Sequence, residues 1–263
     1  MIDIAVLGIG VLGPGLANWA GGQALLRETS TWQRQPTLVP PPDRLPATER
    51  RRAGTVVKAS IVVADQAVAA AGADASRLAT VFTSSTGDPA NCHLLCEALA
   101  APARLVSPTR FTNSVHNAAA GYWHIATRSQ LPSTSLAAFD ASFAAGLLEA
   151  AAQCLSARSP VLLVACDVPY PEPLHSVRPL ADVFALALVL APPGGAGRRL
   201  RLEVLADAAA TPCSDAGLED LRRTIPAARA LPLLQALARG DAAALVLEGL
   251  PGLALRLQLD AAV

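Results

Sequence analysis

The sequence has little charge for its length, and nearly all of its positive charge comes from arginine. Charged residues make up 16% of the 263 residues, basic and acidic side chains number 21 each, and lysine occurs only at Lys58. Aromatic residues make up 4% of the chain, and no basic stripe alternates with them. These shortages argue against nucleic acid and against an anionic membrane surface as partners.

A targeting segment and a long apolar run are missing as well. The sequence begins MIDIAVLGIGVLGPG, with Asp3 and no basic residue before the apolar run, whereas a signal peptide begins with positive charge. One of the longest apolar runs, 183–191, is far shorter than the roughly 18 residues that a membrane-spanning helix needs. We therefore expect a cytoplasmic protein without a membrane span.

The five cysteines show no repeated spacing, and an odd number does not suggest a disulfide framework. Cys92, His93 and Cys96 could hint at a metal site, but a tetrahedral site needs a fourth ligand and the other cysteines are isolated. We predict no bound metal and interpret this segment as part of a buried helix.

Three glycines near the N-terminus form the pattern G-x-G-x-x-G at Gly8, Gly10 and Gly13. This pattern is typical of dinucleotide binding when a helix follows and a second strand ends in an acidic residue. Here a proline-rich loop replaces that second strand. We interpret the glycines as a tight turn from strand to helix and predict no cofactor.

The remaining pattern predicts alternating strands and helices built around a substantial apolar core, since 52% of the residues are hydrophobic. Five further strands and a helical stretch near 215–238 are expected after residue 158. Strands that alternate with helices favour an α/β layered fold. In the first part we expect strands at 2–12, 79–86 and 133–139, an extended segment at 104–111, and helices at 48–72, 91–101, 113–128 and 141–158.

The segment 109–150 resembles the β-ketoacyl synthases, which condense acyl thioesters in fatty-acid and polyketide synthesis. Pro132, Ser133 and Ser135 match the strand G-P-S-x-S that precedes the family's catalytic cysteine, with Leu131 in place of its glycine. The resemblance extends over residues 1 to about 190. It implies a thiolase-like layered α/β fold, with a ketosynthase-like N-terminal half at 1–190 and an abbreviated second half at 191–263 that belongs to the same domain.

Two departures from the family argue against catalysis. Asp140 lies where the family has its cysteine, and a carboxylate is a far poorer acyl acceptor than a thiolate. Taken alone, Asp140 is explained as the N-cap of the helix 141–158. The family also has two histidines in its distal half, whereas this chain has only His175 after residue 124. We therefore predict no catalytic residue.

This sequence resembles the chain length factor, an inactive ketosynthase-like subunit. The chain length factor pairs with an active ketosynthase and shapes its acyl tunnel. The phrases NSVHNAAAGYW, DASFAAGLLEA and CDVPYPEPL are similar to the short form found with aryl polyene biosynthesis. The resemblance implies a heterodimer with an active ketosynthase, which brings in acyl carrier protein, and Phe111 as a gate at the tunnel floor. The residues expected to face the partner are Ser107, Pro108, Thr109, Arg110, Phe111, Thr112, Asn113, His116, Asn117, Ser133, Ser135, Leu136 and Phe139.

Two other functions stay open at this point. His116 and His124 lie eight residues apart on one predicted helix, where both are interpreted as buried histidines, and a functional one would bond to Asp140 or across the interface. An independent thioester hydrolase or decarboxylase would use Asp140 with His116 as its base. A homo-oligomeric scaffold would only bind acyl carrier protein.

Overall fold

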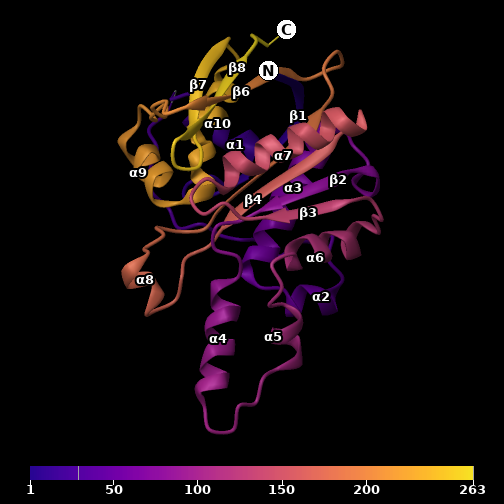
Figure 1. Ribbon diagram of the computed structural model, residues 1–263, viewed down its shortest axis with the longest axis vertical. Coiled ribbons are helices and arrows are strands. Elements are labelled where there is room, and N and C mark those ends of the chain that lie inside the picture. Colours follow the sequence, from indigo (N-terminus) through magenta and orange to yellow (C-terminus); the bar gives the residue numbers. More distant parts are fainter. Residues whose placement is uncertain (29, 263) are drawn as a thin grey trace.

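Eight strands form one mixed sheet with helices on both faces in the computed structural model, which describes residues 1–28 and 30–262 (Figure 1). The strand order is β3-β2-β4-β5-β1-β6-β8-β7. β2 pairs in parallel with β3 and β4, and the other neighbours are antiparallel. The strands are β1 (Ile2–Leu12), β2 (Ala79–Thr83), β3 (Ser133–Leu136), β4 (Val161–Asp167), β5 (Phe184–Ala191), β6 (Arg198–Ala206), β7 (Ala243–Glu248) and β8 (Leu253–Leu259).

The helices form a layer on each side of the sheet, and shorter ones lie in its connections. One layer contains α3 (Thr55–Ala71) and α6 (Ala118–Thr127), which share a core cluster with one side of β4 and β5. The other contains α1 (Trp19–Leu26), α7 (Ser142–Ala157), α9 (Ala216–Thr224), η2 (Pro226–Ala230) and α10 (Leu231–Arg239). The connections hold α2 (Ala47–Arg52), η1 (Ala75–Arg77), α4 (Pro89–Ala100), α5 (Pro108–Thr112) and α8 (Leu174–Val177).

The central strands are buried on both faces because both layers cover them. Along β4, Val161 and Leu163 belong to one core cluster, whereas Leu162 and Val164 belong to the other. Successive side chains of a strand point to opposite faces, so this alternation places an apolar layer on each side of the sheet. The central sheet therefore positions the loops at its ends rigidly.

The C-terminal strands extend the sheet of the first part instead of forming a separate one. β6 pairs antiparallel with β1, and β8 and β7 follow outward from it. The division at residue 190 stays a prediction. Among the described residues no helix is long and apolar enough to cross a bilayer.

Several predicted elements have different bounds in the structure. The helix expected at 48–72 is two helices, α2 and α3, because Ala53 is extended and Gly54 lies so close to Asp88 that a Cβ there would meet its Oδ2 at 2.4 Å. The helix expected from residue 113 begins at Ala118. The segment expected to be extended around Pro108 forms α5, since proline is tolerated in a first helical turn.

The turn expected from the glycine pattern is present only at Gly13, which forms a bridge with Leu16 before α1, whereas Gly8 and Gly10 lie inside β1. A Cβ on Gly10 would lie 2.0 Å from the carbonyl oxygen of Val63, and one on Gly8 would lie 2.1 Å from that of Ala67. Both carbonyls belong to α3. The glycines therefore allow a helix to lie directly against the strand.

The helix predicted to be buried around Cys92 is mostly exposed instead. In α4 only Pro89 and Asn91 are buried, both Cys92 and Cys96 are exposed, and His93 pairs with Glu97 at 3.2 Å. We call residues 89–112 the arm, because α4, α5 and the loop between them project from the body (Figure 1). The arm has few core contacts because its apolar side chains point outward, among them Leu94, Leu99, Leu105 and Phe111.

Candidate functional site

Asp140 lies at the junction between β3 and α7, where two arginines hold its carboxylate. Arg178 Nη2 donates to Oδ1 at 2.6 Å, and Arg229 Nη2 donates to Oδ2 at 3.2 Å. The predicted N-cap role is wrong, since Ala141 is the N-cap residue and has no capping side-chain bond. The position predicted to match the family's nucleophile thus holds an ion pair.

The backbone at this junction is strained, and an arginine contacts its exposed aromatic ring. Phe139 has φ +51°, a conformation that costs free energy for a residue with a Cβ. The guanidinium carbon of Arg178 lies 3.9 Å from the centroid of the Phe139 ring, a cation–π contact. Arg178 therefore holds both Phe139 and Asp140 in place.

The ion pair continues into the C-terminal part of the chain. Arg229 Nε lies 3.0 Å from Glu248 Oε2, and Arg222 Nη1 lies 3.2 Å from the same atom. Glu219 is bonded to Arg222 at 2.7 Å, which holds the pKa of the Glu219 carboxyl below its ordinary value. This chain of charges fastens the β3–α7 junction to η2, β7 and α9.

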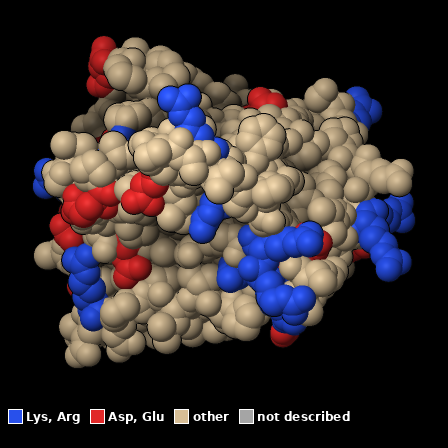
Figure 2. Space-filling model, turned by 90° about the horizontal axis from the view of Figure 1, so that it is seen from below, with Lys and Arg blue, Asp and Glu red and all other residues tan. Residues whose placement is uncertain are grey.

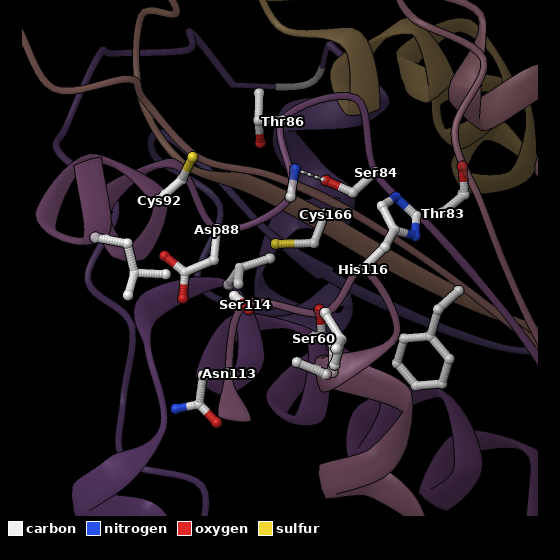
Figure 3. Close-up of a pocket in the computed structure, with 17 residues that line it drawn as sticks. Ser60, Thr83, Ser84, Thr86, Asp88, Cys92, Asn113, Ser114, His116 and Cys166 are labelled. Atoms are coloured by element: carbon white, nitrogen blue, oxygen red, sulfur yellow. Dashed lines mark hydrogen bonds between the residues drawn. The ribbon is translucent and has the colours of Figure 1, made fainter. Parts of the chain in front are cut away.

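A cavity of about 240 Å³ opens on the other face of the sheet, at the end of β2. In Figure 3, His116 and Thr83 lie on one side of it, Asp88 and Cys92 lie on the other, and Cys166 lies between them. Its apolar lining residues are Val56, Phe82, Leu95, Val115, Ala118 and Ala119. A cavity with this lining can accept an apolar chain.

The two thiols of this cavity are poor nucleophiles. Burial raises the pKa of the Cys166 thiol, which is 2% exposed, and burial also raises the pKa of the Cys92 thiol. A thiol is reactive as the thiolate, so a raised pKa keeps both groups protonated at neutral pH. Both thiols therefore lack the lowered pKa that is typical of a reactive cysteine.

Most of the residues predicted to face a partner are at the surface of the chain. Phe111 is 69% exposed and Phe139 is 66% exposed. Asn113 is the exception: its side chain is 8% exposed, donates to the carbonyl of Arg52 and accepts from the hydroxyl of Tyr122. The other exposed members are Pro108, Thr109, Thr112, His116, Asn117 and Ser133, and the half-buried ones are Ser107, Arg110, Ser135 and Leu136.

The two histidines do not share a helix, contrary to the prediction. His116 precedes α6, is exposed, and lines the cavity. His124 lies on α6 with Nε2 at 3.5 Å from Thr80 Oγ1. Within residues 1–28 and 30–262 no hydrogen bond joins either histidine to Asp140, and both oxygens of that carboxylate are bonded to arginine. The pair required for the hydrolase function is not assembled.

Comparison of the sequence with models of known protein families identifies the family of this chain. The model described as β-ketoacyl synthase, N-terminal domain, matches residues 23–248. The chain belongs to this family. A search of curated protein sequences found no match.

Solved structures with the same thiolase-like ketosynthase fold include complexes of two subunits. A chain of the ketosynthase (ApeO) in complex with its chain length factor (ApeC) from Xenorhabdus doucetiae has a TM-score of 0.76 and 21% identity, over 98% of this chain and 100% of that one. The ishigamide ketosynthase/chain length factor gives 0.73 and 13%, over 100% of both chains. A β-ketoacyl synthase from Burkholderia phymatum STM815 gives 0.71 and 11%, over 100% of both.

Sequence reasoning missed the residues that surround Asp140 and the cavity. Arg178 and Arg229 are 38 and 89 residues from Asp140 in the chain, so no local pattern in this family member indicates them. Asp167 is 1% exposed and accepts bonds from the loop 84–87 and from η2, but it ends an apolar strand without any motif. An acidic residue at the end of a buried strand is the one signal that could have found it.

Proposed function

We propose that this chain is a non-catalytic chain length factor. It pairs with an active β-ketoacyl-ACP synthase in fatty-acid or polyketide elongation of the aryl polyene type, and it shapes the acyl tunnel of that enzyme. The observation that supports this best is Asp140, whose two carboxylate oxygens are bonded to arginine at the position of the family's nucleophile. An acyl group cannot be carried there, because the residue is neither a thiolate nor free.

Exposed apolar side chains beside this position support the pairing. Phe111, Val115 and Phe139 are each more than half exposed, and all three lie in or next to the segments expected at the interface. β3 is an edge strand, and a free strand edge is a template for pairing with another chain. Figure 2 shows much of the face that carries the arm as neither basic nor acidic. A ketosynthase subunit would cover these groups.

In the complex, Phe111 acts as the gate at the tunnel floor and the cavity beside His116 takes part of the acyl chain. Val115 and His116 line the cavity and lie four and five residues after Phe111. An acyl chain that passes the gate would thus meet an apolar wall. Acyl carrier protein reaches the complex through the ketosynthase subunit.

Co-expression with the ketosynthase encoded nearest to this chain tests the proposal. We expect a one-to-one complex in size-exclusion chromatography and acyl elongation only by the pair, with each chain inactive alone. A chain that stays soluble alone and releases thiol from an acyl thioester would refute the proposal. A homo-oligomer that binds acyl carrier protein without a ketosynthase would refute it as well.

Replacing Asp140 by asparagine should leave elongation by the pair within roughly twofold of the wild-type rate, a small change in activation free energy. The variant should lose up to about 1 kcal/mol of unfolding free energy, because Arg178 and Arg229 lose a charged partner that is 35% exposed. Elongation rates and urea midpoints measure both effects. Asp3→Asn, which breaks the pair with Arg199, is the matched control. Loss of product with the complex intact would assign Asp140 a chemical role.

A further inference from the structure

Asp167, at the end of β4, is a buried carboxylate that accepts hydrogen bonds from the loop 84–87 and from the helix η2. Its Oδ1 accepts from the backbone N–H of Ser85 at 2.7 Å and of Thr86 at 3.0 Å, and from the hydroxyl of Ser84 at 3.1 Å. Its Oδ2 accepts from the N–H of Ala227 at 2.8 Å. Burial raises the pKa of this carboxyl, while these donors act in the opposite direction. This number of donors indicates the ionised carboxylate, because that form only accepts hydrogen bonds.

The first of these segments, 84–87, forms a wall of the cavity. Ser84, Thr86 and Gly87 line the cavity, as does Cys166 (Figure 3). The Ser84 hydroxyl also accepts from the N–H of Gly87 at 2.9 Å, so the loop is fixed along its length. Asp167 is not among the lining residues, since it follows Cys166 on β4 and points to the opposite face of the sheet.

The second segment is the short helix η2, which also bonds to the group of charges around Asp140. Ala227 lies in η2 two residues before Arg229, which binds Asp140. Arg178, the other partner of Asp140, also donates to the hydroxyl of Ser85 at 2.8 Å. Both carboxylates therefore link the loop 84–87 to η2. Asp167 bonds directly to the backbone of both segments, whereas Asp140 is linked to them through Arg178 and Arg229.

We infer that Asp167 is a positioning residue that fixes the 84–87 wall of the cavity and thereby limits the length of acyl chain that the complex makes. The inference rests on the proposed function in its second part only. Asp167→Asn keeps the shape of the side chain but replaces one acceptor oxygen with an NH₂ group. In the Oδ1 position the NH₂ group would face the N–H groups of Ser85 and Thr86, and in the Oδ2 position it would face the N–H of Ala227. In either position a donor meets a donor, so at least one hydrogen bond is lost.

The test uses the full chain in its complex with the ketosynthase. Amide hydrogen exchange in peptides that contain residues 84–87 should become at least about tenfold faster in Asp167→Asn, since the acceptor of Ser85 and Thr86 is weakened. The product mixture from the same complex should shift in chain length. Thr86→Val removes one donor to Asp167 at 3.3 Å and the acceptor of the Val168 N–H at 3.2 Å, but it leaves the backbone bonds of Ser85 and Thr86 to Asp167 intact. It should give a smaller change in both readouts, even where Asp167→Asn folds poorly.

Leu257→Ala is the control for general destabilisation. Leu257 is fully buried in β8, and four strands separate β8 from β2 in the sheet. It should lower stability and leave both the exchange at 84–87 and the product lengths unchanged. Wild-type exchange at 84–87 in Asp167→Asn, or unchanged product lengths, would overturn the inference. A wild-type pair without elongation would refute the proposed function, while the exchange rates would still decide the role of Asp167.

Discussion

Phe111→Glu should prevent the chain from holding its ketosynthase partner. Phe111 is 69% exposed on α5, so the substitution leaves the core of the chain intact. In the proposed complex the aromatic ring is buried at the interface, where a carboxylate without a partner is strongly unfavourable. Truncating a central aromatic of an interface costs about 2 kcal/mol or more. The dissociation constant should therefore rise at least about 30-fold.

Calorimetric titration of the two subunits, or size-exclusion chromatography of the co-expressed pair, measures this effect. Val204→Glu is the matched control, since Val204 is 51% exposed on β6, which four strands of the sheet separate from β3. Both variants should keep the wild-type unfolding temperature. A complex of unchanged affinity with Phe111→Glu would remove α5 from the interface.

Phe111 is a cleaner probe of the interface than Phe139, although both rings are exposed. The Phe139 ring lies 3.9 Å from the guanidinium carbon of Arg178, and its backbone has φ +51°. A substitution there would disturb the strained junction and the Asp140 ion pair together. Within the described residues, the Phe111 side chain makes no hydrogen bond, ion pair or cation–π contact. Its replacement therefore tests binding to the partner.

The main strands and the long helices of the first 190 residues were predictable because local patterns determine them, whereas the short helices α1, α5 and α8 were not predicted. The strand at 2–12 and the helix at 141–158 agree with β1 and α7 to within a residue at each end. Both have strong apolar periodicity and clear end signals. The family resemblance around Asp140 was also local, since it depends on one continuous segment of sequence, and the family is confirmed.

The partners of Asp140 and the exposure of the arm were not predictable in the same way. Helix capping explained Asp140 from its neighbours in the chain, but Arg178 and Arg229 come from distant loops that the fold brings together. The segment around Cys92 has the composition of a buried helix, yet no sheet face is available to cover it. Burial depends on where an element is placed, and the sequence pattern of α4 does not contain that information.

The glycine pattern shows most clearly how one motif can serve two different structures. Gly8 and Gly10 are two residues apart on β1 and face the carbonyls of Ala67 and Val63, which are four residues apart on α3. Two residues of a strand span about 6.6 Å and four residues of a helix span about 6 Å. The spacing of the pattern thus matches one turn of a helix lying against the strand, and no bound dinucleotide is required to explain it.

Gly10→Ala should therefore be among the most destabilising single substitutions in the chain. The new Cβ would lie 2.0 Å from a helix backbone oxygen that no side-chain rotation can move. We expect a loss of more than about 3 kcal/mol of unfolding free energy, because α3 must move away from the sheet that it covers.

Urea unfolding of Gly10→Ala beside Gly121→Ala tests this packing with the same chemical change at two positions. A Cβ on Gly121 meets nothing within 4 Å on α6, so that variant should gain up to about 1 kcal/mol from its higher helix propensity. A wild-type midpoint for Gly10→Ala would mean that α3 does not lie directly against β1. The glycines would then again require a turn or a bound ligand to explain them.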